Sequence, residues 1–163
     1  GKRTWIDGVP HLKSIEQIFK EKAGKDPYEI VGEIDGTELL EKSYFGPFDD
    51  LPAQGEAGGY PKEVARVATT WTPYQPAAAN VSHTVIDGGD DVSDTEGTGI
   101  VHVAPGCGQI DLQWGKANHL PAVAPLDESG VFLDGFGPLS GKNAVDPATA
   151  DVVFEHLKAN GRL

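Results

Sequence analysis

The chain lacks the features that define several large protein classes. Its single cysteine, Cys107, excludes an internal disulfide framework and is typical of a reducing cytosol. No apolar run approaches the roughly 18 residues that a membrane-spanning helix needs. No charged and then apolar leader of the secretory type is visible at the N-terminus. We therefore expect a cytoplasmic protein that does not act at a membrane.

Positive charge is also scarce. The chain has 13 basic and 25 acidic residues, a formal net charge of −12. A free-standing nucleic-acid-binding protein needs clustered lysine and arginine for phosphate contacts, and here acids are interleaved with most of the basic residues. If RNA is the substrate, most of its backbone must be held by another part of a larger protein.

Several catalytic and metal-binding patterns are missing. No serine lies in a G-x-S-x-G elbow, which argues against a serine hydrolase triad. Gly97-Thr98-Gly99 precedes an expected strand and lacks the lysine of a phosphate-binding loop. His102, Cys107 and Asp111 are five and four residues apart, which matches no zinc pattern. We expect no metal and no cofactor, and we interpret Cys107 as a small residue filling a glycine turn.

What is present suits one compact domain over residues 1–163. Short β-prone runs outnumber helical patterns, so we expect an α+β fold, a β-rich and partly closed barrel with peripheral helices. A long surface loop is expected at 46–62, and the other histidines are interpreted as surface or loop residues. Helices are expected over 15–24, 110–117 and 147–160, and strands over 28–34, 64–72, 83–86, 99–104, 122–126 and 131–133.

The C-terminal helix carries the clearest signals. Asp146 is placed to cap it, Pro147 suits its first turn and Gly161 its end. Its apolar spacing predicts a buried face, made of Ala150, Val153, Phe154 and Leu157. A turn at 127–130 is expected to join the last two strands.

The run from Gly97 to Asp111 is the most informative stretch. Alternation places Ile100, His102 and Ala104 on one face of a strand that Pro105 ends. Gly106 and Gly108 then allow the backbone to come close to a ligand or a neighbouring strand. Asp111 follows near a helix start, so the pattern predicts that an imidazole and a carboxylate meet in one small cleft.

This run, GTGIVHVAPGCGQID, resembles the signature of the editing domain of isoleucyl-tRNA synthetases. The related leucyl and valyl segments have no histidine at the position of His102. The likeness continues through Gly115 and the PLDESG stretch at 125–130 to the final helix, and upstream it includes the Tyr-x-x-Pro-x-Phe pattern, here Tyr44, Pro47 and Phe48.

The resemblance implies roles for individual residues. Asp111 would pair with the ammonium group of a misattached amino acid, and His102 would line the side-chain pocket and exclude isoleucine. The field of Asp111 and backbone donors of the turn would stabilise the charge that develops when a positioned water attacks the ester. The catalytic residues implied are Asp111 and His102, and the substrate-binding residues are Thr98, Gly99, His102, Pro105, Gly106, Gly108 and Asp111.

One departure from the family concerns a threonine-rich strand that lines the same pocket. In the family it lies well before the Tyr-x-x-Pro-x-Phe pattern, whereas the similar stretch here, Thr69–Pro73, comes after it. Either the chain begins downstream of the true strand, which we favour, or Thr69–Pro73 replaces it, or the likeness is accidental. In the first case part of the pocket is missing.

The resemblance therefore implies post-transfer editing by an isoleucine–tRNA ligase: hydrolysis of Val-tRNA(Ile) made in error, within a larger ATP-dependent synthetase of protein biosynthesis. Its partners would be the 3′ end of tRNA(Ile) and the remainder of the synthetase. The alternative is a truncated or degenerate editing domain that keeps the fold and contacts tRNA without hydrolysis. A free-standing deacylase is disfavoured, because the chain offers no evident tRNA-binding surface.

Overall fold

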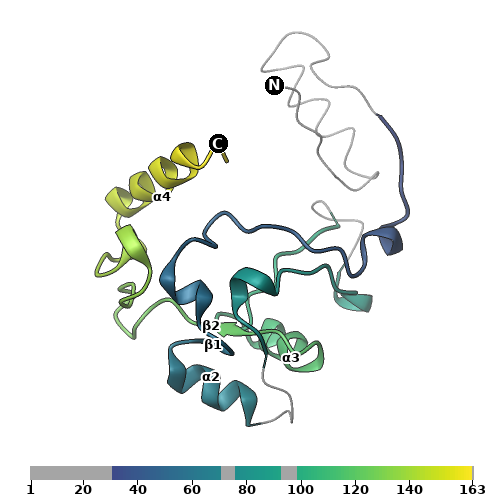
Figure 1. The fold of residues 1–163 in the computed structure, drawn as a ribbon, viewed down its shortest axis with the longest axis horizontal. Helices are drawn as coiled ribbons and strands as arrows, with labels where there is room; N and C mark the ends of the chain where they lie inside the picture. Colours follow the sequence, from purple (N-terminus) through teal and green to yellow (C-terminus); the bar gives the residue numbers. More distant parts are fainter. Residues whose placement is uncertain (1–30, 71–75, 93–98, 163) are drawn as a thin grey trace. The chain divides into compact units, whose positions relative to one another are not determined.

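A computed structural model describes residues 31–70, 76–92 and 99–162 of the chain (Figure 1). Its contacts divide it into two units. Unit 1 comprises residues 1–41 and 86–102, and unit 2 comprises residues 42–85 and 103–163. The helix expected over 15–24 and most of the strand expected over 28–34 lie outside the described residues.

The described parts of unit 1 are short turns. Asp35 begins a 3-10 helix, Gly36–Leu39, in which its carboxylate accepts from the Thr37 N–H and the Glu38 side chain accepts from the Asp35 N–H. This reciprocal pair is a capping box. A second 3-10 helix, Gly89–Asp91, forms an acidic turn.

The centre of unit 2 is a pair of two-residue strands. β1, Gly59–Tyr60, runs parallel to β2, Ala122–Val123, with Gly59 opposite Ala122 and Tyr60 opposite Val123. Gly59 lies so close to β2 that a Cβ there would overlap the Ala122 carbonyl, and its φ of 113° also favours glycine. Figure 1 shows the two strands side by side, near the helices α2 and α3.

The segment expected as a strand over 64–72 is a helix instead. α2 spans Lys62–Thr69, followed by Thr70 in helical geometry, so the described end of the Thr69–Pro73 stretch is not a strand. The valines and threonines favoured the strand prediction through their β-propensity. The lysine and glutamate before them and the alanines and arginine between them are better helix formers, and Ala65 is buried.

The core of unit 2 lies around two further 3-10 helices, Pro52–Gly55 and Gly137–Leu139. Its buried residues are Leu51, Ala53, Phe136 and Leu139. The prediction of a long surface loop at 46–62 is therefore wrong, because this stretch supplies Leu51 and Ala53, two of these four buried residues. The ring of Tyr60 meets that of Phe136 edge to face, with centroids 5.5 Å apart.

The C-terminal helix α4, Pro147–Ala159, begins and ends as predicted. The Asp146 carboxylate accepts from the Ala148 N–H at 2.9 Å, and Gly161 follows with a φ of 64°. Its buried face is only partly as predicted. Val152 and Val153 pack on the core, whereas Ala150 and Phe154 are exposed.

A buried polar residue explains part of the difference between the predicted and the observed buried face of α4. Thr149 is buried, and its hydroxyl donates to the Asn143 carbonyl at 2.7 Å. Because a satisfied hydroxyl can be buried at little cost, the buried face of the helix includes positions that apolar spacing alone does not indicate.

The turn at 127–130 is confirmed. The Asp127 side chain accepts from the N–H groups of Ser129 and Val131, at 2.8 and 2.9 Å. The flanking strands expected over 122–126 and 131–133 are reduced to β2 and to isolated bridges, among them Leu126 opposite Phe132.

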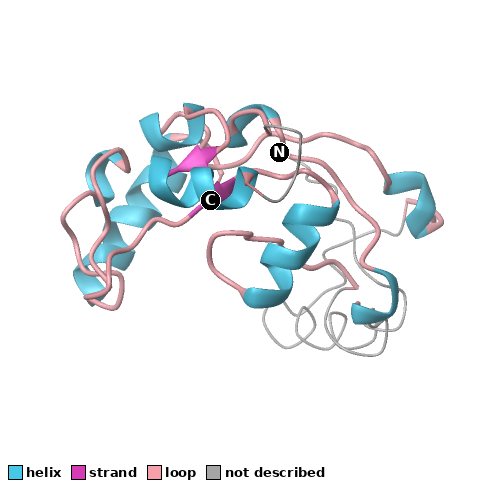
Figure 2. Cartoon of the chain, turned by 90° about the horizontal axis from the view of Figure 1, so that it is seen from below, coloured by secondary structure: helices cyan, strands magenta, loops and turns pink. Residues whose placement is uncertain are grey.

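The predicted β-rich barrel is wrong. The described residues form three α-helices and one two-stranded parallel sheet that does not close (Figure 2). The stretches expected as strands over 83–86 and 99–104 make one isolated bridge, at Thr84, and no strand. β-Branched residues supply propensity, but a barrel needs partners along the whole length of each strand, and these segments lack them.

Candidate functional site

The carboxylate of Asp111 lies in the first turn of α3. This helix spans Gln109–Ala117, as the periodicity predicted, and Gly108 is its N-cap. Asp111 is half-buried, and a negative charge at this position is stabilised by the partial positive charge of the helix N-terminus. The helix therefore holds one carboxylate next to the glycine turn.

Hydrogen bonds close the turn before α3. The N–H groups of Cys107 and Gly108 both donate to the Ala104 carbonyl, at 2.9 and 3.4 Å. Pro105 has no N–H to offer. The Gly106 N–H is thus the donor of the Pro105–Gly108 turn that has no hydrogen-bond partner among the described residues.

Three close approaches fix this turn against its neighbours. A Cβ on Gly106 would overlap the Val123 carbonyl in β2, and one on Gly108 would overlap the Asp111 carboxylate. A Cβ on Gly115, one turn further along α3, would lie 2.7 Å from Cβ and 2.8 Å from Cγ of Pro105. Of the two uses expected for Gly106, the structure supports close approach to a strand.

The Cys107 thiol is partly buried within the turn. The residue is exposed overall, but its sulfur lies 3.9 Å from the Val123 carbonyl oxygen. Partial burial of the sulfur raises the pKa of the Cys107 thiol, and the neighbouring Asp111 carboxylate raises it further. The thiol is therefore a poor nucleophile at neutral pH, in keeping with a residue that fills the turn.

The predicted site residues divide between the two units. Pro105, Gly106, Gly108 and Asp111 come together in unit 2. Gly99, with a φ of 71°, and the exposed His102 belong to unit 1, and Thr98 lies outside the described residues. The shared face of Ile100, His102 and Ala104 was argued from a strand that does not form, so a meeting of His102 with Asp111 stays a prediction.

A hollow of about 10 Å³ in unit 2 has Pro105, Leu112, Gly115, Ala68 and Ala122 among its lining residues. This volume holds at most one water molecule. It is too small for a valine side chain, so it does not supply a pocket for the side chain of an amino acid.

Other classes of site are not indicated in the parts that the structure describes. Those parts contain no group of three or more histidine, cysteine, aspartate or glutamate side chains placed to hold a metal ion. Within the same residues, no helix has the length and apolar character needed to cross a membrane.

A second polar cluster in unit 2 was not predicted. The His83 Nε2–H donates to Oδ1 of Asp49 at 2.6 Å, and Oδ2 of Asp49 accepts from the Gly46 N–H at 2.7 Å. The ring of Tyr44 stacks on the His83 ring at 5.0 Å. Both side chains of the pair are about four-fifths buried, with exposed fractions of 22% and 21%, so His83 is not an exposed surface residue, although it lies outside any helix or strand.

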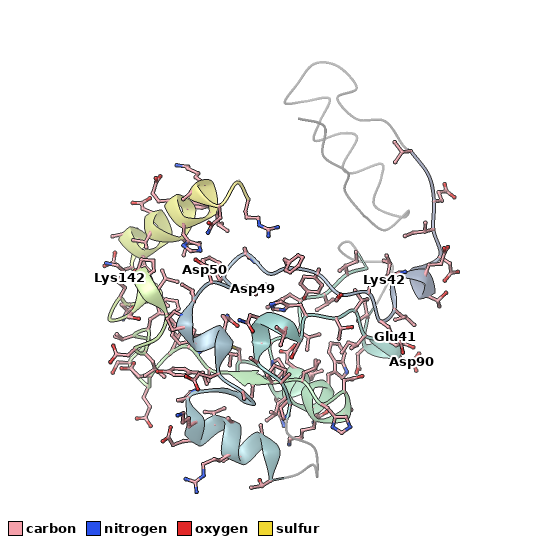
Figure 3. All side chains as sticks on the ribbon, in the orientation of Figure 1. Glu41, Lys42, Asp49, Asp50, Asp90 and Lys142 are labelled. Atoms are coloured by element: carbon pink, nitrogen blue, oxygen red, sulfur yellow. The ribbon has the colours of Figure 1, made fainter. Side chains whose placement is uncertain are left out.

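The next aspartate, Asp50, repeats this arrangement in a looser form. Its Oδ1 lies 3.3 Å from Nε2 of His156 in α4, and Phe48 stacks on the His156 ring at 4.9 Å. Figure 3 labels Asp49 and Asp50 on neighbouring positions of one segment. The adjacent aspartates beside Tyr44 and Phe48 were the available sequence signal, but nothing in the sequence links them to histidines 34 and more residues away.

Comparison with known proteins shows that the chain is similar to segments of synthetases. It is 33% identical over 161 residues to the isoleucine–tRNA ligase of Methanothermobacter thermautotrophicus, covering 97% of this chain and 12% of the ligase. It is 30% identical over 128 residues to the ligase of Sulfolobus acidocaldarius, covering 78% of this chain and 10% of the ligase. A third, from Prochlorococcus marinus, is 37% identical over 90 residues, covering 55% of this chain and 9% of the ligase.

No model of a known protein family matches the chain, and no solved structure matches it. Nearly the whole of this chain is matched, but it spans only about an eighth of the length of the M. thermautotrophicus ligase. By sequence, the chain is thus related to a segment of isoleucine–tRNA ligases.

Proposed function

We propose that this chain is the editing segment of a longer isoleucine–tRNA ligase, which hydrolyses Val-tRNA(Ile) formed in error. The observation that carries the proposal is the similarity to such ligases over 161 residues, which includes the Gly-Thr-Gly to Asp111 run. The physical need is clear, because a synthetic site distinguishes isoleucine from valine by one methylene, worth about 1–3 kcal/mol.

The chemistry assigns Asp111 to the substrate ammonium group. A carboxylate at the start of α3 suits a cation, and a charge-assisted contact of this kind orients the ester beside the turn. The Gly106 N–H, which has no hydrogen-bond partner among the described residues, would donate to the developing oxyanion.

The reaction itself needs no covalent intermediate with the protein. A water oxygen attacks the ester carbonyl carbon, the bond from that carbon to the ribose oxygen breaks, and the ribose oxygen takes up a proton. The products are free valine and tRNA(Ile). His102 would line the side-chain pocket and exclude isoleucine, as the resemblance implies.

The acidic character of the chain is consistent with a role in which other domains of the ligase bind most of the tRNA. With a net charge of −12, it would contact the tRNA chiefly at its 3′ end, and the remainder of the synthetase would hold the RNA backbone. Its partners in this proposal are therefore tRNA(Ile) and the other domains of the same ligase.

The alternative function is that of a segment that contacts tRNA without hydrolysis. The hollow of about 10 Å³ that Pro105, Leu112 and Gly115 help to line favours this alternative, because it cannot receive a side chain. A deacylation assay with Val-tRNA(Ile) and Ile-tRNA(Ile), on this chain and on the complete ligase, separates the two. We expect the complete ligase to cleave Val-tRNA(Ile); a complete ligase that cleaves neither substrate favours the alternative.

A further inference from the structure

The face of α3 that carries Asp111 packs closely against the Pro105–Gly108 turn, because Gly115 on the same face has no side chain. Asp111 and Gly115 are four residues apart and share one face of the helix. At one end of this face the Asp111 carboxylate lies over Gly108, and at the other end the buried Gly115 lies against the Pro105 ring.

This contact has no room for a methyl group. A Cβ on residue 115 would stand 2.7 Å from Pro105 Cβ, about 1 Å closer than ordinary carbon–carbon contact allows. The turn cannot retreat, because Gly106 is already in contact with the Val123 backbone of β2. Added bulk at residue 115 must therefore move α3, and Asp111 with it.

We propose that Gly115 is a positioning residue of the site: it sets the distance between the Asp111 carboxylate and the Gly106 N–H. The inference rests on the proposed function, since it names the residue that holds the substrate-facing carboxylate at its working distance from the oxyanion donor. A displacement of about 1 Å in such a site costs on the order of 100-fold in rate.

Gly115→Ala tests this in the complete ligase, with Gly55→Ala as the matched control. A Cβ on Gly55 meets nothing closer than the Asn80 side-chain nitrogen at 3.8 Å. Alanine is the better helix former, so a loss caused by Gly115→Ala cannot come from a weakened α3. We expect Gly115→Ala to lower kcat for Val-tRNA(Ile) hydrolysis by about 10- to 100-fold and Gly55→Ala to leave it unchanged.

Cys107 supplies a second readout that does not depend on activity. Its thiol lies in the turn, against Val123 and near Asp111, so a displaced α3 makes it more reactive. We expect Gly115→Ala to be alkylated several-fold faster at Cys107 than wild type in this chain, at neutral pH. Adding Pro105→Gly removes the atoms that clash and restores slow alkylation, which a variant that merely unfolds does not show.

The outcomes are distinct. Unchanged alkylation in Gly115→Ala, or full hydrolysis by that variant in an active ligase, overturns the positioning role while leaving the proposed function in place. A wild-type ligase without hydrolysis overturns the proposed function, and the catalytic role of Gly115 with it.

Discussion

Two short segments of unit 2 present carboxylates, and they are held by opposite means. The Pro105–Gly108 turn beside Asp111 is fixed by missing side chains, since three glycines let backbone and ring atoms touch. The Tyr44–Asp50 segment is fixed by side chains that are present, since Asp49 pairs with His83 and Tyr44 stacks on that histidine. The first should not tolerate added atoms, and the second should not tolerate removed ones.

The largest expected effect separates the two carboxylates by function. Asp111→Ala in the complete ligase should abolish most Val-tRNA(Ile) hydrolysis, because loss of one charge-assisted contact costs on the order of 2–4 kcal/mol, or roughly 30- to 1000-fold in rate. Asp49→Ala should instead lower the free energy of unfolding. Deacylation kinetics and denaturant unfolding of both variants check this; hydrolysis lost through Asp49→Ala alone would reverse the assignment.

The next effect concerns added bulk in the glycine turn. Gly106→Ala should lower the free energy of unfolding of this chain by about 3 kcal/mol, because the new Cβ meets backbone atoms of Val123 and Ala124 that cannot rotate away. Urea unfolding of Gly106→Ala and of the control Gly55→Ala measures it. Equal stability of the two variants would mean that the turn is not in contact with β2.

A smaller effect is expected where a side chain is removed from the other segment. His83→Ala should cost about 2 kcal/mol, through the lost hydrogen bond to Asp49 and the lost stacking on Tyr44. A double-mutant cycle with Asp49→Asn isolates the pair. A coupling energy near zero would show that the two side chains do not interact in solution.

The smallest effect probes the charge around the turn. Burial is the larger cause of the raised pKa of the Cys107 thiol and the Asp111 carboxylate the smaller one, so Asp111→Asn should lower this pKa in part. The thiolate fraction at neutral pH then rises, and alkylation of Cys107 should speed up by a few-fold. Rates measured from pH 7 to pH 10 give the shift directly; an unchanged profile would place Asp111 too far from the sulfur to act.

The same contrast explains how much of the molecule could be predicted from the sequence. The ends of α4 were predicted because Asp146, Pro147 and Gly161 act on their own neighbours in the chain. The turn at 127–130 and the helix α3 were predicted for the same reason, and so was the glycine turn with its carboxylate. Local signals of this kind need no knowledge of distant partners.

Errors arose where distant contacts decide the outcome. The strand predicted over 64–72 rested on valines and threonines, whereas the segment forms α2, with strong helix formers between them and Ala65 packed within unit 2. The pair of His83 and Asp49 joins residues 34 positions apart, which no periodicity reveals. For the candidate site, the sequence placed Asp111 at a helix start beside the glycine turn, as in the structure, but it placed His102 on a strand that the structure does not contain.

The most direct test of the central claim is the ratio of two rates in the complete ligase: hydrolysis of Val-tRNA(Ile) and hydrolysis of Ile-tRNA(Ile). An editing segment must reject the larger amino acid, and one methylene discriminates by at least about 10-fold. We predict that Val-tRNA(Ile) is cleaved at least about 10-fold faster, and that Asp111→Ala removes the difference by removing the faster rate. Equal cleavage of both substrates, or cleavage of neither, would contradict the account.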